Sequence, residues 1–232
     1  ELLRSAPGDI DQIYLRKARP SRESAEMLDL CRAAKVRFAL VPDDALARLC
    51  PGVRHQGVLA RLRSSSRVAW ETLLTEAADA PLPLVVALDQ VQDPGNVGTL
   101  ARTLYALGGA GLVLPRHNSA YLGPGARRSA AGALERLPLA EVVNLARAVE
   151  QAREAGFSTY AARFAEDGMN ALSAPLEFPA LLVLGNEDRG VRPGVAKQCA
   201  HSLHVPFLRD FDSLNVAQAG GILISCFARA HA

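Results

Sequence analysis

The sequence predicts an α/β protein with a small N-terminal α/β domain and a larger C-terminal domain built on a mostly parallel sheet. From residue 84 onward, apolar runs of strand length alternate with helical segments, which is typical of a parallel sheet covered by helices on both faces. Hydrophobic residues make up 49% of the 232 residues, enough for a substantial core. A short polar stretch, Ser64 to Ser66, separates the two regions.

The first 62 residues contain three strand-like runs and two helical segments. We predict strands at 10–15, 36–41 and 57–62, and helices at 21–34 and from Asp43 or Asp44 to 49. Ser21 is a suitable N-cap for the first helix, and either aspartate suits the second.

The remaining segments follow the order of a sheet with helices on both sides. A short helix is expected at 68–80. We predict strands at 84–88, 111–114, 157–161, 181–184 and 202–205, and helices at 97–107, 126–134, 145–155, 193–199 and 214–229. The chain therefore divides into a domain at 1–63, a linker at 64–80 and a domain at 81–232.

Charge is distributed unevenly. The net charge of the chain is only +2. Residues 1–67 carry 13 lysines and arginines against 8 acidic residues, a balance of +5, which leaves −3 for the rest. A basic module on a slightly acidic body favours a polyanion such as nucleic acid as its partner.

Several classes of protein are disfavoured. No run of about 18 apolar residues is present, so we expect no membrane span. The first residues lack the apolar stretch of a signal peptide. The cysteines show neither a CxxC pair nor metal-ligand spacing, so we expect reduced thiols and a cytoplasmic location: Cys31, Cys50, Cys199 and Cys226. His201 and His204 form the only close histidine pair and lack a suitably spaced acidic ligand, so no metal site is expected.

The usual nucleotide-binding fingerprints are also missing. No GxGxxG follows a predicted strand, and no GxxxxGK[ST] occurs. Gly185 and Gly190 have the P-loop glycine spacing, but Val191 and Arg192 follow them where lysine and a hydroxyl residue are needed. A nicotinamide dehydrogenase and a P-loop NTPase are therefore disfavoured.

Three polar blocks each follow an apolar run of strand length. They are Asp93-Pro94-Gly95-Asn96-Val97-Gly98 with Arg102, then Gly185-Asn186-Glu187-Asp188-Arg189-Gly190, and then Val205-Pro206 with Ser213-Leu214-Asn215-Val216. Open α/β sheets build their sites from polar groups at strand C-termini. Together the blocks resemble the three signature motifs of the SpoU/TrmH family of RNA ribose 2′-O-methyltransferases, in order, across residues 84–230. The order of segments in residues 1–62, with His55-Gln56-Gly57-Val58, resembles the L30e-like RNA-binding module of rRNA-modifying members.

The resemblance implies a SPOUT fold with a trefoil knot that binds S-adenosylmethionine. By motif position, Gly185, Val205 and Leu214 match the cofactor contacts of the family. A glycine at the end of a strand allows backbone to approach a ligand closely. Pro206 fixes the turn after the next predicted strand.

The resemblance also implies the catalytic residues. Arg102 matches the family's catalytic arginine, and Asn96, Glu187, Ser213 and Asn215 match its other polar motif positions. A guanidinium with a pKa above about 12 is a poor base, so we assign Arg102 to phosphate binding and to stabilising the developing oxyanion. We expect Asn96 to cap its helix and Glu187 to hold either Arg102 or a backbone amide.

The chain departs from the family pattern in one place. Members commonly have glycine between Val-Pro and Ser-Leu-Asn-Val, where this chain has Phe207-Leu208-Arg209-Asp210-Phe211-Asp212. Family members are homodimers with the last helix near the interface. We therefore expect some of one helix face to meet a second copy of the chain: Val216, Gly220, Leu223, Ile224 and Phe227.

These observations predict an S-adenosylmethionine-dependent RNA ribose 2′-O-methyltransferase whose substrate is 23S rRNA, at a guanosine. Within the family, a tRNA enzyme and an adenosine-directed rRNA enzyme are the alternatives. A non-catalytic RNA-binding assembly factor is the alternative of another class, and the presence of Asn96, Arg102, Glu187 and Asn215 argues against it.

Overall fold

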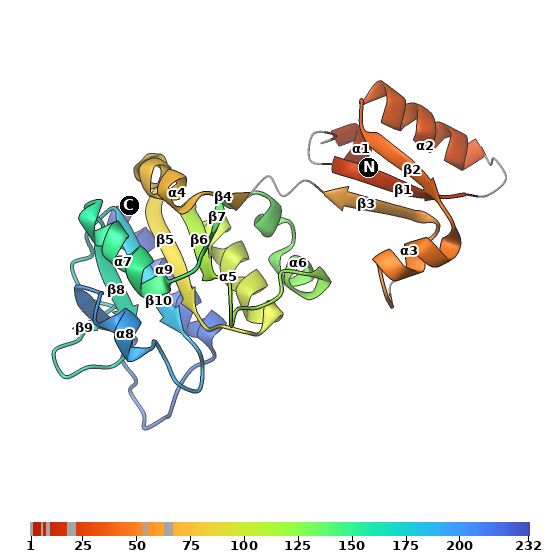
Figure 1. Cartoon of the computed structure of the whole chain (residues 1–232). Helices are drawn as coiled ribbons and strands as arrows, with labels where there is room; N and C mark the ends of the chain where they lie inside the picture. The colour runs from red at the N-terminus through yellow and green to blue at the C-terminus, as the bar shows by residue number, and fades with distance from the viewer. Residues whose placement is uncertain (1, 6, 8–9, 18–21, 53–54, 63–66) are drawn as a thin grey trace. The chain divides into compact units, whose positions relative to one another are not determined.

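The computed structural model describes residues 2–5, 7, 10–17, 22–52, 55–62 and 67–232, and the chain forms two compact units (Figure 1). The units are Glu1–Ser65 and Ser66–Ala232. The predicted linker core, Ser64 to Ser66, and the predicted N-cap Ser21 lie outside the described residues. The described part of the segment predicted as linker, residues 67–80, belongs to the second unit.

The first unit is a three-stranded sheet with short helices. Its elements are α1 (Leu2–Ser5), β1 (Ile10–Arg16), α2 (Arg22–Ala33), β2 (Arg37–Val41), α3 (Asp43–Leu49) and β3 (Val58–Leu62). The strand order is β2-β1-β3, with β1 parallel to β2 and antiparallel to β3. Alternate residues of β1, Ile13 and Leu15, pack into a core with Cys31 and Val36. Pro42 occupies the N-cap of α3, so the prediction that an aspartate caps it is wrong: Asp43 and Asp44 lie in the first turn instead.

Carboxylates neutralise much of the basic charge in the first unit. The described residues of this unit form six ion pairs: Arg4–Glu26, Arg16–Asp43, Arg32–Asp29, Arg37–Asp11, Arg48–Asp44 and Arg61–Asp11. Their side chains are largely exposed, so each pair adds little stability. The balance of +5 already subtracts these carboxylates, so the ion pairs leave the positive excess predicted from composition unchanged.

The second unit is a parallel sheet with helices on both faces. Its elements are β4 (Arg67–Val68), α4 (Trp70–Glu76), η2 (Ala77–Asp79), β5 (Leu82–Asp89), α5 (Pro94–Ala106), β6 (Gly109–Pro115), α6 (Pro124–Ala130), η3 (Ala133–Glu135), β7 (Leu139–Val142), α7 (Leu145–Glu154), β8 (Ser158–Ala162), β9 (Met169–Asn170), β10 (Ala180–Gly185), α8 (Pro193–Ala196), β11 (His201–His204) and α9 (Val216–His231). The strand order is β4-β7-β6-β5-β10-β8-β11-β9, and each pair is parallel. The trefoil knot stays a prediction.

β5 runs through the middle of this sheet and is buried along its whole length (Figure 1). Leu84, Val86 and Leu88 pack with α5, α6 and α9, whereas Val85 and Ala87 pack with α4, α7 and α8. A continuous apolar run is what a strand covered on both faces requires. The predicted α/β architecture with helices on both faces is confirmed.

Three strands were not predicted. β4 and β9 have two residues each, too few to show a periodic pattern, and β7 is a four-residue strand interrupted by the charged Glu141. β4 nevertheless joins the sheet by pairing with β7, directly before α4. The predicted helix at 68–80 is shorter, and it ends in the 3₁₀ turn η2.

The last helix packs against the core of its own unit. A Cβ atom on Gly220 would lie 2.3 Å from Leu100 of α5 and 2.7 Å from Leu184 of β10, so a side chain at this position would hold α9 away from the sheet. The face expected to meet a second copy is buried within the chain, and that expectation is wrong for all five residues: Val216, Gly220, Leu223, Ile224 and Phe227. No described helix is both long and apolar enough to cross a membrane.

Candidate active site

Three motif residues from distant parts of the chain meet above the carboxyl end of the sheet. Glu187 Oε1 accepts hydrogen bonds from Asn96 Nδ2 at 2.6 Å and from Asn215 Nδ2 at 3.1 Å. Asn215 Nδ2 also donates to Asn96 Oδ1 at 3.1 Å. Glu187 and Asn215 are exposed and Asn96 is half-buried, so a ligand can reach this polar cluster. Glu187 therefore binds two side-chain amides, and the prediction that it holds Arg102 or a backbone amide is wrong.

Local helix-capping chemistry places the two asparagines. Asp93 is the N-cap of α5 and accepts a hydrogen bond from the Asn96 backbone N–H at 2.7 Å, while Pro94 occupies the first turn. The prediction that Asn96 caps this helix is wrong, because its side chain is committed to the polar cluster. Asn215 is the N-cap of α9, where its Oδ1 accepts from Ala217 N at 2.9 Å. Its Nδ2 is thereby left to face Asn96 and Glu187.

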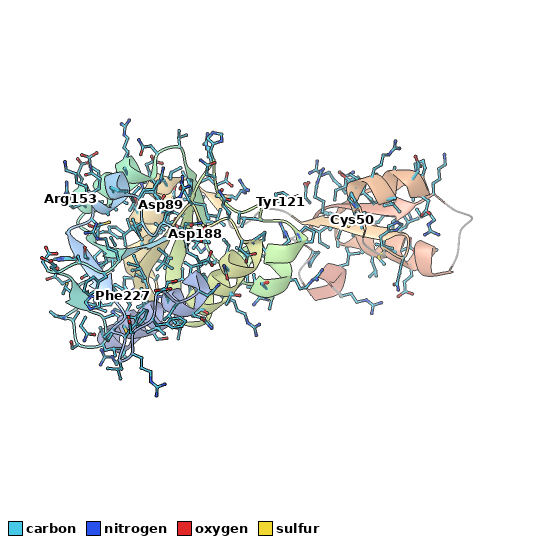
Figure 2. The ribbon with its side chains drawn as sticks, turned by 90° about the horizontal axis from the view of Figure 1, so that it is seen from below. Cys50, Asp89, Tyr121, Arg153, Asp188 and Phe227 are labelled. Carbon is cyan, nitrogen blue, oxygen red and sulfur yellow. The ribbon has the colours of Figure 1, made fainter. Side chains whose placement is uncertain are left out.

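An ion pair between the buried carboxylate of Asp89 and the partly exposed Arg192, which was not predicted from the sequence, holds the loop that carries Glu187. Asp89 ends β5, is 0% exposed and is labelled in Figure 2. It accepts hydrogen bonds from Arg192 N and Arg192 Nε, both at 2.8 Å. Asn186 Nδ2 reinforces this contact by donating to Gln90 O at 3.2 Å. The loops after β5 and β10 are therefore tied together beside the polar cluster. The sequence feature that could have indicated this pair is Asp89, an acidic residue at the end of the otherwise apolar strand β5.

Gly185 has a steric role within the chain. A Cβ atom there would lie 2.0 Å from the Gly190 carbonyl carbon and 2.1 Å from Val191 N. Because the clash is with backbone, the loop that follows β10 can turn back only over a glycine. This clash is by itself a sufficient reason for a glycine here, and close approach of the backbone to a ligand stays a prediction. A branched residue here would disturb the loop itself.

A cavity of about 720 Å³ lies beside the third motif. Val205 and Leu214, predicted as cofactor contacts, both line it, as does Ser213, whereas Gly185 is not among its lining residues. Its volume is typical of a small-molecule site. The segment 207–212, where the chain departs from the family pattern, supplies much of the wall, including Phe207 and Phe211. An apolar wall with backbone at two loop ends suits an adenosine-bearing ligand.

Arg102 stands apart from the polar cluster. It lies on α5, is exposed and has no hydrogen bond or ion pair with any described residue. The six residues from Asn96 to Arg102 advance the helix by about 9 Å and rotate it by about 240°. The two side chains therefore point to different sides of α5. The structure brings together Asn96, Glu187 and Asn215, places Ser213 next to them in the chain, and leaves Arg102 free in solvent.

Among the described residues, no group of three or more His, Cys, Asp or Glu side chains has the arrangement of a metal site. The four cysteines are free thiols. Burial raises the pKa of the Cys199 thiol to about 12. This thiol is therefore protonated and unreactive near neutral pH.

Comparisons with known proteins identify the family of each unit. Residues 83–225 match the SpoU rRNA Methylase family, and residues 1–68 match the RNA 2′-O ribose methyltransferase substrate binding family. The 23S rRNA (guanosine-2′-O-)-methyltransferase RlmB of Burkholderia is 32% identical to the chain, over 96% of the chain and 89% of that protein.

Two solved structures have a similar fold. A TrmH-family structure from Porphyromonas gingivalis superposes with a TM-score of 0.72 at 27% identity, covering 98% of this chain and 85% of that one. The SpoU methyltransferase AviRb of Streptomyces viridochromogenes, in complex with AdoMet, gives 0.72 at 23% identity over 95% and 82% of the two chains. Because the family match spans more than half of the chain and includes the three motifs, this protein belongs to the SpoU rRNA Methylase family.

Proposed function

We propose that this protein transfers a methyl group from S-adenosylmethionine to the 2′-hydroxyl of a ribose in 23S rRNA, at a guanosine. The convergence of Asn96, Glu187 and Asn215 from three separate motifs on one hydrogen-bonded cluster carries this proposal. The choice of 23S rRNA and guanosine is supported by relatives such as the Burkholderia protein, which match nearly the full chain.

The residues present fit the cofactor. When bound, S-adenosylmethionine supplies an electrophilic methyl group on a sulfonium. Val205 and Leu214 would hold it in the cavity of about 720 Å³, and Ser213 would line the same space. Ser213 and Leu214 directly precede the N-cap of α9, where the positive end of the helix dipole favours a carboxylate or another anionic group.

The polar cluster would orient the substrate hydroxyl. Glu187 uses Oε1 for both amide contacts, and no described residue forms a hydrogen bond to Oε2. Oε2 can therefore accept a hydrogen bond from a ribose hydroxyl. This hydrogen bond increases the electron density on the hydroxyl oxygen. Asn96 and Asn215 fix the carboxylate in place. Arg102 has no partner among the described residues, so its guanidinium is available to bind a phosphate of the RNA and to stabilise the developing oxyanion.

Residues 1–63 would form an L30e-like module that selects the RNA. Residues 81–232 would form the methyltransferase domain that follows it. Support comes from the match of the first unit to the substrate-binding family and from the excess of basic residues up to position 67. Because six of its arginines are already paired with carboxylates, we expect recognition by a few unpaired cations and by shape rather than by overall charge.

We also propose that the chain acts as a homodimer in the cytoplasm, where 23S rRNA is made in bacteria. The side of α9 away from the core exposes Gln218, Ile222, Ser225 and Arg229, with Ile222 36% exposed. A second copy placed against α5 and α9 would bring a partner to the solvent-facing Arg102. Sedimentation equilibrium tests the dimer directly, because a monomer at micromolar concentration would contradict it.

Incubation with isotopically labelled S-adenosylmethionine tests the activity. We expect label in 23S rRNA, on a guanosine ribose, and none in tRNA. Label in tRNA or on adenosine would instead favour the other substrates considered within the family. Cofactor binding without any transfer would favour a non-catalytic RNA-binding role.

A further inference from the structure

A second cavity, of about 570 Å³, opens at the carboxyl ends of β4, β6 and β7. Val68 and Val142 end two of these strands, and Arg116 directly follows the third. The start of α4 and the first turns of α7 complete the wall. We call this cavity the arginine groove, after three of its lining residues: Arg67, Arg116 and Arg147.

The groove contains uncommitted positive charge. Arg67 is paired with Glu141 at 2.6 Å. Arg116 and Arg147 are exposed, and neither guanidinium has a hydrogen bond or ion pair with a described residue. Helix α7 begins in the groove, with Asn144 as its N-cap, and adds the positive end of its dipole. Glu71 is the one lining carboxylate without a described partner.

The groove shares an edge of the sheet with the candidate active site. β6 is adjacent to β5 and two strands from β10, about 10 Å at the usual strand spacing. Arg116 N donates to Val142 O at 2.8 Å, and Ala120 N donates to Val91 O at 3.0 Å, in the loop that leads to Asn96. The residues 116–120 therefore connect the groove to the polar cluster through backbone hydrogen bonds.

We propose that the arginine groove binds the phosphate backbone of the RNA strand that flanks the methylated ribose. This rests on the proposed function. Arginine presents a planar fork of donors that matches a phosphate, and two free forks beside a helix N-terminus form a ready anion site. A strand held there extends along the same edge to Glu187. The groove would thus help to set which nucleotide reaches the active site, independently of the first unit.

The test uses the full-length chain with Arg116→Ala/Arg147→Ala and in vitro transcribed 23S rRNA. Loss of two phosphate contacts should weaken RNA binding about 20-fold at 0.1 M salt and reduce the slope of log K against log salt by about 1.4. Arg153→Ala is the matched control, because Arg153, which is labelled in Figure 2, is an exposed arginine in the last turn of the same helix and does not line the groove. It should leave both quantities unchanged.

The outcomes separate this proposal from the proposed function. Calorimetry should show unchanged S-adenosylmethionine binding by the double variant. If the double variant transfers methyl groups at the wild-type rate, with unchanged RNA affinity and an unchanged slope of log K against log salt, the groove is not an RNA site. Absence of transfer by the wild type would refute the proposed function, whereas the salt slopes would still report on the groove. If the alanine pair loses its fold, Arg116→Gln/Arg147→Gln provides the same comparison.

Discussion

Arg192 holds the wholly buried carboxylate of Asp89 through its backbone N–H and its Nε, each at 2.8 Å. The two partners are unequal, because the Arg192 side chain is 43% exposed and that of Asp89 is 0% exposed. Removing the arginine strands a buried charge, whereas neutralising the aspartate leaves a guanidinium that water can reach.

We therefore predict that Arg192→Ala lowers the free energy of unfolding by about 3 kcal/mol. Asp89→Asn keeps an acceptor oxygen and the shape of the side chain, and should cost less. Urea unfolding of both variants measures the difference. A larger loss for Asp89→Asn than for Arg192→Ala would contradict this ranking of the two partners.

Two substitutions of Glu187 distinguish the effect of its negative charge from its role in holding the two asparagine amides. Glu187→Ala removes the acceptor of both asparagine amides and should reduce methyl transfer by about 10²-fold or more. Glu187→Gln retains a carbonyl oxygen in the Oε1 position, so it should keep the cluster in place and lose only the effect of the negative charge. Single-turnover rates on saturating RNA compare the two. Equal rates for wild type and alanine variant would remove Glu187 from the site.

The two units should be separable. A chain beginning at Arg67 retains β4 and both apolar clusters of the second unit. We expect it to fold and bind S-adenosylmethionine, and to lose most of its RNA affinity and rRNA methylation. Circular dichroism, calorimetry and filter binding measure these properties. Full methylation by the shortened chain would show that the first unit does not choose the substrate.

The pH dependence of Cys199 alkylation tests whether this thiol is buried in the folded second unit. Burial raises the pKa of this thiol to about 12, so the reactive thiolate is scarce at pH 8. We expect alkylation about 10³-fold slower than that of a thiol with a pKa near 9, and a rate that rises with pH toward 12. Because the raised pKa favours the neutral form, its contribution to stability is complete below pH 9 and is lost as the pH rises further. Mass spectrometry of iodoacetamide adducts measures the rate, and rapid labelling of Cys199 at pH 8 would contradict the burial.

Periodic patterns were sufficient to predict the long elements but not the short ones. β5 and β10 are continuous apolar runs flanked by polar loops, so a doubly covered parallel sheet followed directly. β4, β7 and β9 form only because neighbouring strands accept them, which is a tertiary effect. The buried face of α9 was identified correctly, but its partner is α5 and β10 of the same chain.

The motifs predicted which residues matter better than they predicted what those residues do. Asn96, Glu187 and Asn215 came together, although their mutual hydrogen bonds could not be read from positions 91 and 28 residues apart. Gly185 proved to be needed for its own loop, and Asp93 took the cap expected of Asn96. The Asp89–Arg192 pair joins residues 103 positions apart and was not predicted.

Arg102 is exposed and without a described partner, so Arg102→Ala should change stability by less than about 0.5 kcal/mol. Its loss should nevertheless reduce methyl transfer by about 10²-fold, with S-adenosylmethionine binding retained, because it would act on the substrate oxyanion. Arg128→Ala, at an exposed arginine of α6 outside the motifs, is a suitable control.

The central claim is tested most directly by mass spectrometric mapping of ribose methylation in 23S rRNA and tRNA incubated with S-adenosylmethionine and either the wild type or Arg102→Ala. We predict one new 2′-O-methylguanosine in 23S rRNA with the wild-type chain, strongly reduced with the variant, and no new methylation in tRNA. An unmodified 23S rRNA after incubation with the wild-type chain, or the same modification at full rate with Arg102→Ala, would contradict the account.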